Sequence, residues 1–115
     1  MTSAGLPEAA VQQLRALFRD YPTIRRVVLY GSRAKETYRK RSDIDLCVEA
    51  ADMTFSELLA IENRVDDLLL PWKVDLSLLR QIESPDLLEH IQRVGKVFYD
   101  KKEDLTSHFS RLPRS

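Results

Sequence analysis

A chain of 115 residues is the size of one small domain, and its composition excludes several classes of protein. The 18 basic and 18 acidic side chains cancel, whereas a dedicated nucleic-acid-binding domain normally carries a basic excess. No apolar run approaches the ~18 residues that span a bilayer, no secretory segment follows Met1, and the single cysteine, Cys47, cannot form an internal disulfide. These features predict a cytoplasmic protein that binds neither nucleic acid nor membrane directly.

The first half of the chain predicts one helix and two strands. Apolar residues at helical spacing indicate a helix from Pro7 to about Arg19, and a β-branched and aromatic run indicates a strand over residues 24–30. Residues 32–42 are polar and strongly basic, which is typical of a loop. Residues 43–49 then alternate between apolar and polar side chains, which predicts a second strand with two unlike faces.

The second half predicts helix, strand, helix and strand. A capping-box sequence at Thr54 opens a helix that Pro71 stops, and residues 73–79 alternate as a strand. Ser84, Pro85 and Asp86 form a helix start, and Gly95 fits a left-handed helix end before a last strand over residues 96–100.

This order of elements predicts the fold class. It indicates an α/β protein of the α+β type, with a small mixed sheet of about four strands flanked by helices. We expect residues 1–100 to form the domain. Residues 101–115 have no periodic apolar face and are expected to form a flexible C-terminal tail.

Three aspartates form the candidate chemical centre. Asp43 and Asp45 are two residues apart on a predicted strand, so both carboxylates face one side while Ile44 and Leu46 face the core. Asp75 holds the equivalent polar position on a later strand and joins them if the two strands are neighbours. Close carboxylates repel each other unless a cation lies between them, and Mg²⁺ prefers such oxygen ligands together with phosphates. Three acids can hold two Mg²⁺ ions.

A glycine and a serine precede the acids at a suitable distance for a phosphate site. Gly31 ends the first strand, where the lack of a side chain lets backbone amides approach an anion, and Ser32 offers a hydroxyl donor. Arg33 and the other basic residues of the loop add positive charge beside a polyanionic ligand.

Together, Gly31-Ser32, ten intervening residues, Asp43-x-Asp45 and the later Asp75 resemble the motif of the nucleotidyltransferase superfamily that includes DNA polymerase β. Within it, the short length, the GSRA and SDIDL sequences and the closing Gly95-Lys96 segment resemble the minimal nucleotidyltransferases. The resemblance covers residues 24–100. One departure is the Lys35-Glu36 pair, where many relatives carry glycine.

The resemblance implies a fold and an activity. It implies a polymerase β-like fold that transfers a nucleoside monophosphate from a nucleoside triphosphate, here ATP, to a hydroxyl and releases pyrophosphate. Asp43, Asp45 and Asp75 would ligate two Mg²⁺ ions, with Asp75 helping to deprotonate the acceptor. Gly31, Ser32 and Arg33 would bind the nucleotide.

The resemblance also implies a partner. Minimal nucleotidyltransferases are typically encoded beside a helical HEPN toxin, so the chain is expected to act as an antitoxin that attaches AMP to a toxin tyrosine. Two alternatives remain at this point. A catalytically weak module would neutralise the same partner by occlusion, which the Lys35-Glu36 departure favours, and a small-molecule hydroxyl would serve as acceptor if the chain built a pocket for it.

Overall fold

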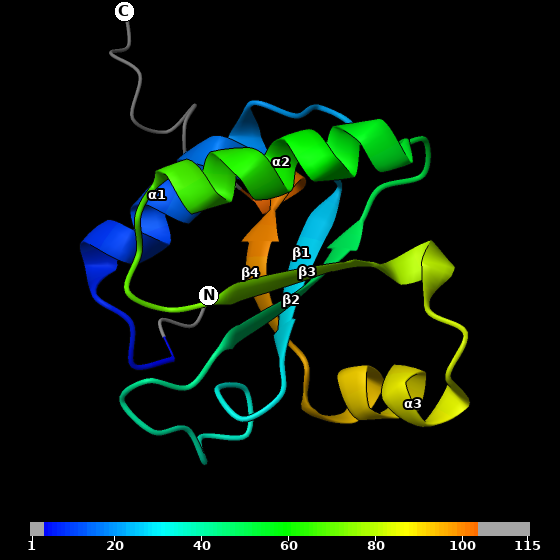
Figure 1. Ribbon diagram of the computed structural model, residues 1–115. Coiled ribbons are helices and arrows are strands. Elements are labelled where there is room, and N and C mark those ends of the chain that lie inside the picture. The colour runs from blue at the N-terminus through cyan, green and yellow to red at the C-terminus, as the bar shows by residue number, and fades with distance from the viewer. Residues whose placement is uncertain (1–3, 104–115) are drawn as a thin grey trace, which may run out of the picture.

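The computed structural model describes residues 4–103, and its elements follow the predicted order (Figure 1). Most of the predicted tail, residues 104–115, lies outside the described residues. No helix within residues 4–103 has the length and apolar character needed to cross a bilayer. The elements are α1 (Glu8–Arg19), β1 (Arg26–Tyr30), β2 (Ile44–Glu49), α2 (Phe55–Asp67), β3 (Val74–Leu78), the 3₁₀ turn η1 (Leu79–Gln81), α3 (Pro85–Val94) and β4 (Lys96–Asp100).

The four strands form one mixed sheet in the order β3-β2-β1-β4, which confirms the predicted fold class. β1 lies antiparallel to both β2 and β4, while β2 and β3 are parallel and are joined by α2. A parallel pair needs such a crossover because the second strand starts at the same end of the sheet as the first, so the chain has to run back along the sheet between them. β3 and β4 are therefore the two edge strands.

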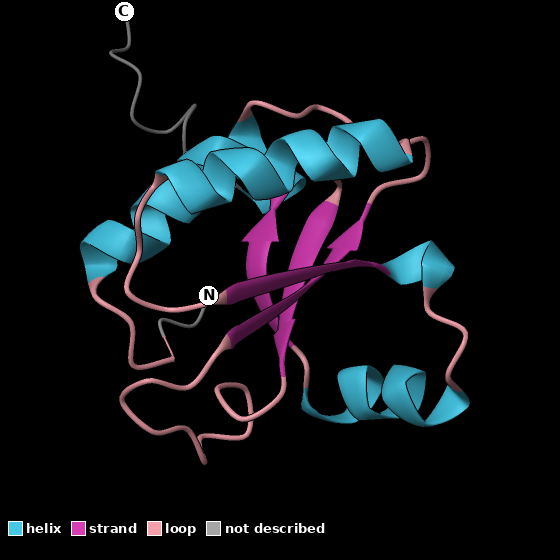
Figure 2. Cartoon of the chain, viewed as in Figure 1, coloured by secondary structure: helices cyan, strands magenta, loops and turns pink. Residues whose placement is uncertain are grey.

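Helices cover both faces of the sheet (Figure 2). α1 and α2 lie over one face, where Ile44, Leu46 and Val48 of β2 join the main core. α3 lies over the other face, where Cys47 packs with Tyr30 and Ile91 in a smaller cluster. The alternation along β2 thus divides its side chains as predicted: apolar residues enter the main core, and the polar face turns toward α3.

Two predicted helix caps are present. The Thr54 hydroxyl accepts a hydrogen bond from the Glu57 amide at 3.1 Å, and the Ser84 hydroxyl accepts one from the Leu87 amide at 3.2 Å. Each satisfies an amide that the first turn of a helix leaves unpaired, and Pro85 at the start of α3 has no amide to satisfy. Local sequence therefore fixes where α2 and α3 begin.

The predicted left-handed end at Gly95 is wrong. Gly95 has φ −59° and ψ 141°, which any residue adopts. A Cβ atom there would collide with the carbonyl oxygen of Ile91 and lie 2.7 Å from a methyl carbon of Val28. Glycine is required because position 95 lies against both the last turn of α3 and Val28 of β1, so the constraint comes from steric contact rather than from a left-handed backbone.

Candidate active site

Asp45 and Asp75 lie side by side at the centre of the site. They occupy paired positions on the parallel strands β2 and β3, so their side chains leave the same face of the sheet. Burial raises the pKa of the Asp45 carboxyl, and the neighbouring charges of Asp75 and Asp43 raise it further, while Lys73 and His90 oppose this effect. β3 is therefore the neighbour of β2 that the hypothesis required, and it brings Asp75 beside Asp45.

Asp43 lies just outside the strand that was predicted to carry it. β2 begins at Ile44, so Asp43 belongs to the end of the preceding loop and is exposed. Its charge still contributes to the raised pKa of Asp45. Within residues 4–103, none of the side chains of Asp43, Asp45 and Asp75 has a hydrogen bond or ion pair to neutralise it. The site thus holds three carboxylates without a direct ion-pair partner among the described residues, and the charges of Asp43 and Asp75 both act on Asp45.

These carboxylates suit a hard cation, with one restriction. Mg²⁺ is usually held by one or two protein carboxylates together with substrate phosphates, and the in-register pair of Asp45 and Asp75 supplies oxygen ligands of this kind. Among the described residues, however, no three His, Cys, Asp or Glu side chains already form a group that could hold a metal. The donor set fits Mg²⁺ that arrives with a nucleotide rather than a preformed three-carboxylate cage.

Gly31 lies directly against Asp45. Its φ of 75° is in the left-handed region, and a Cβ atom at this position would collide with the Asp45 carboxylate. Both constraints require glycine at the end of β1. The predicted phosphate-binding turn and Asp45 are therefore in contact, although thirteen residues lie between Gly31 and Asp45 in the sequence.

His90 is a residue of the site that the sequence interpretation missed. The Gly31 amide donates a hydrogen bond to His90 Nε2 at 3.2 Å, and the His90 ring meets the Tyr30 ring edge-on. The signal in the sequence was its spacing, because His90 lies three residues after Leu87 and so shares the inward face of α3. α3 thus reaches the glycine turn, where it holds a backbone donor.

The loop after Gly31 is built from turns. The Lys35 amide donates to the Gly31 carbonyl at 3.1 Å, and the Thr37 amide donates to the Ser32 carbonyl at 3.0 Å. These bonds use the backbone carbonyl of Ser32 and leave its hydroxyl without a partner among residues 4–103. Ser32 therefore keeps a donor beside Gly31, and its contact with phosphate remains a prediction.

Arg33 is buried and ties the loop to the rest of the fold. Its side chain donates to the carbonyl oxygens of Ser42 at 3.1 Å and of Ala4 at 2.9 Å, and it lies 5.1 Å from the Tyr38 ring and 5.8 Å from the Trp72 ring. Nη2 has no partner within residues 4–103. These contacts give Arg33 a structural part in the loop, and its binding to nucleotide remains a prediction.

Glu36 belongs to the Lys35-Glu36 pair that stands where many relatives carry glycine, and a substitution can measure its effect on the free energy of unfolding. Glu36 has φ 63°, a conformation that is unfavourable for any residue except glycine, and its carboxylate pairs with Lys96 at 3.3 Å on the surface. We expect Glu36→Gly to be more stable than Glu36→Ala by about 0.5–1 kcal/mol, since both lose the ion pair but only alanine keeps the backbone strain. Urea unfolding of both variants tests this, and equal stabilities would contradict it.

Comparison with known proteins identifies the family. The family model for polymerase beta nucleotidyltransferases matches residues 12–104, which includes all four strands and the three acids. The chain therefore belongs to the polymerase beta nucleotidyltransferase family, as the sequence resemblance implied.

The chain is also similar to individual proteins within and around this family. "Putative protein adenylyltransferase MJ1547" of Methanocaldococcus jannaschii is 33% identical over 87 residues, which cover 75% of this chain and 64% of that protein. The match thus spans less than two thirds of the relative's length. A toxin–antitoxin crystal structure with AMP-PNP is 28% identical with a TM-score of 0.64, and covers 86% of this chain and 77% of that one.

A further structure is the complex of a tri-AMPylated HEPN toxin of Shewanella oneidensis with its MNT antitoxin. The matching chain is 25% identical to this one, with a TM-score of 0.62 and coverage of 84% of this chain and 75% of that chain. Minimal nucleotidyltransferase antitoxins are therefore among the structural neighbours of this fold, as the sequence resemblance also implied.

Proposed function

We propose that this protein is a Mg²⁺-dependent nucleotidyltransferase that transfers AMP from ATP to a hydroxyl of a partner protein. The observation that carries the proposal is the contact between the glycine turn and the acids: Gly31 abuts Asp45, which pairs in register with Asp75. Membership of the polymerase beta family, the name of the M. jannaschii relative and the AMP-PNP in a structural neighbour support the reaction class.

The partner in this proposal is a HEPN toxin, which the protein silences as its antitoxin. The tri-AMPylated HEPN toxin bound to an MNT antitoxin of similar fold supports this assignment, and a tyrosine is the proposed acceptor. The described fold uses residues 8–100 for its helices and sheet.

Each residue of the site has a proposed role. Asp43, Asp45 and Asp75 would hold two Mg²⁺ ions, which neutralise phosphate charge when they are bound. The Ser32 hydroxyl and the amides near Gly31 would bind the outer phosphates. Asp75, the outermost of the paired acids, would orient the acceptor hydroxyl and receive its proton.

The proposed transfer forms one bond and breaks one bond at the α-phosphorus of ATP. The acceptor oxygen forms a bond to the α-phosphorus of ATP, the bond from that phosphorus to the bridging oxygen breaks, and pyrophosphate leaves. The proton of the hydroxyl passes to a carboxylate and then to water. Because the bonds at phosphorus form and break in line, the acceptor has to enter from the side opposite the pyrophosphate.

Labelled ATP tests the proposal. The protein is incubated with [α-³²P]ATP, Mg²⁺ and the product of the adjacent gene, and transfer of label to that protein is expected to fall about 100-fold or more in Asp75→Asn. Asp67→Asn, an exposed acid at the end of α2, serves as the matched control and is expected to retain transfer. Absence of transfer by the unaltered protein, or equal transfer by Asp75→Asn, would contradict the proposal.

The second candidate function is neutralisation by occlusion without chemistry. The observation that favours it is the lack of a preformed three-residue metal group among residues 4–103. Survival of cells that express the partner separates the two functions. Protection by Asp75→Asn equal to that of the unaltered protein would favour occlusion, and loss of protection would favour transfer.

A further inference from the structure

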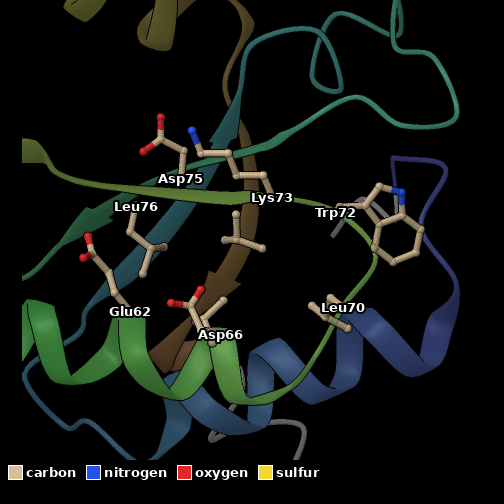
Figure 3. A pocket seen from close by; sticks show the side chains of 9 residues that line it. Glu62, Asp66, Leu70, Trp72, Lys73, Asp75 and Leu76 are labelled. Carbon is tan, nitrogen blue, oxygen red and sulfur yellow. The ribbon is translucent and has the colours of Figure 1, made fainter.

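A cleft runs along the open edge of β3, beside the candidate active site (Figure 3). Its volume is about 330 Å³, and one of its lining residues is Asp75. In Figure 3, Asp75 and Lys73 leave one side of β3, while Leu76 leaves the other side toward α2. The cleft therefore connects the proposed acceptor carboxylate with the surface between β3 and α2.

The backbone of β3 is unpaired on this side. β3 ends the sheet, and the Ile44 amide of β2 donates to the Lys73 carbonyl at 2.9 Å. Since the peptide groups of a strand alternate in direction, the N–H and C=O groups of Val74 and Leu76 point away from β2. An extended segment that added to this edge would find donors and acceptors already arranged for it.

Acidic side chains line the opposite wall of the cleft. Glu62 and Asp66 rise from α2 toward β3 (Figure 3), and neither has an ion-pair partner among the described residues. With Asp75, they make three acids against the single cation of Lys73. A basic segment would complement this charge, whereas an acidic segment or a nucleic acid would be repelled.

The same stripe of α2 continues into exposed apolar side chains. Positions 55, 59, 62 and 66 are spaced by four, three and four residues and so share one face of the helix. Phe55 is 63% exposed and Leu59 is 43% exposed, although both are large apolar residues. The surface beside β3 therefore offers apolar contact at one end and negative charge at the other.

We propose that this cleft binds an extended, lysine- or arginine-rich segment of the partner as an added strand on β3, with its acceptor hydroxyl opposite Asp75. Adjacent strands are ~4.8 Å apart and paired side chains leave the same face, so the added hydroxyl would lie beside Asp75 much as Asp75 lies beside Asp45. The inference rests on the proposed function, because it names the acceptor that the transfer reaction would use.

Binding of two tyrosine copolymers tests the inference without any need for catalysis. Fluorescence anisotropy is measured with labelled poly(Lys,Tyr) and poly(Glu,Tyr), and the protein is expected to prefer the basic copolymer. Glu62→Lys/Asp66→Lys is expected to weaken poly(Lys,Tyr) binding about tenfold or more, because two attractive charges become repulsive. Asp52→Lys/Asp67→Lys is the matched control: it makes the same change in net charge at exposed positions outside the lining of the cleft. Equal weakening by both double variants would overturn the inference.

Hydrogen exchange tests the added strand itself. With saturating poly(Lys,Tyr), the amide exchange rates of Val74 and Leu76 are expected to fall about tenfold or more, since these amides become hydrogen-bonded to the new strand. Unchanged exchange of both amides would overturn the arrangement. Failure of the proposed function is a separate result, because it appears as absence of label transfer to any acceptor while copolymer binding is retained.

Discussion

Replacing Asp45 by asparagine is expected to abolish AMP transfer and, at the same time, to make the fold more stable. Transfer is expected to fall about 100-fold or more, because Asp45 is a proposed ligand of Mg²⁺. Stability is expected to rise because the Asp45 carboxyl is partly buried beside Asp75 and Asp43, and these surroundings raise its pKa above the ordinary 3.8. The asparagine side chain keeps the shape and removes the charge.

The raised pKa of Asp45 also predicts how the stability difference between Asp45→Asn and the unaltered protein changes with pH. The folded protein holds the Asp45 proton more tightly than the unfolded chain, so the favourable contribution of the protonated form is complete below pH 3.8 and is lost as the pH rises through the raised pKa. We therefore expect the Tm of Asp45→Asn to exceed that of the unaltered protein at pH 7, and the difference to shrink as the solution is acidified. Differential scanning calorimetry in the absence of divalent cations measures it.

An exposed acid supplies the control for this experiment. Asp52→Asn, in the turn after β2, removes one charge away from the site and is expected to leave both Tm and transfer unchanged. Addition of Mg²⁺ with AMP-PNP is expected to raise the Tm of the control but not that of Asp45→Asn, by ligand mass action. A lower Tm for Asp45→Asn than for the unaltered protein at pH 7 would show that the carboxylate stabilises the fold, contrary to the electrostatic argument.

Gly31→Ala is expected to remove transfer as completely as loss of an acid, although no catalytic group is changed. The new methyl group would occupy the space of the Asp45 carboxylate, and the φ of 75° would remain unfavourable. The backbone term costs about 1–2 kcal/mol of folding stability. Displacement of Asp45 by about 1 Å is enough to reduce the rate about 100-fold, because metal and phosphate positions depend on that carboxylate. Steady-state transfer and urea unfolding report the two effects.

Two variants separate the collision from the backbone strain. In an Asp45→Ala background the carboxylate is absent, so Gly31→Ala is expected to cost only the backbone term, and the difference is the coupling energy of the pair. Gly5→Ala also places a methyl group at a positive φ, 77°, but against the Tyr38 ring and away from the acids. It is expected to destabilise the fold while retaining AMP-PNP binding. If Gly31→Ala reduced the free energy of unfolding equally in the unaltered protein and in Asp45→Ala, the proposed contact would be refuted.

The elements of this fold were predictable because their signals are local. The capping hydroxyls of Thr54 and Ser84 bond to amides three residues away, and the alternation along β2 assigns its faces without reference to other strands. The candidate acids were found for the same reason, since a period of two places polar residues on one face. The family resemblance added the expectation that these acids serve one reaction.

Gly95 and His90 show where local reasoning stopped. Gly95 was assigned to a left-handed turn, whereas close contact with the Ile91 carbonyl of α3 and with Val28 of β1 requires it. His90 carried no motif, and only the position of α3 over the sheet brings it to the Gly31 amide. The contact of Gly95 with Val28 and the bond of His90 to Gly31 both depend on where α3 lies on the sheet, which a short window of sequence does not encode.

The sequence by itself determined the order of the helices and strands, the polar face of each strand, and the residue types available for phosphate and metal chemistry. Only the tertiary structure decided that β3 lies parallel to β2 with Asp75 opposite Asp45, that Gly31 lies against Asp45, and that β3 leaves an open edge beside an acidic helix face. The physical reason is range: periodicity and caps act over a few residues, whereas strand register is set by packing between segments about thirty residues apart.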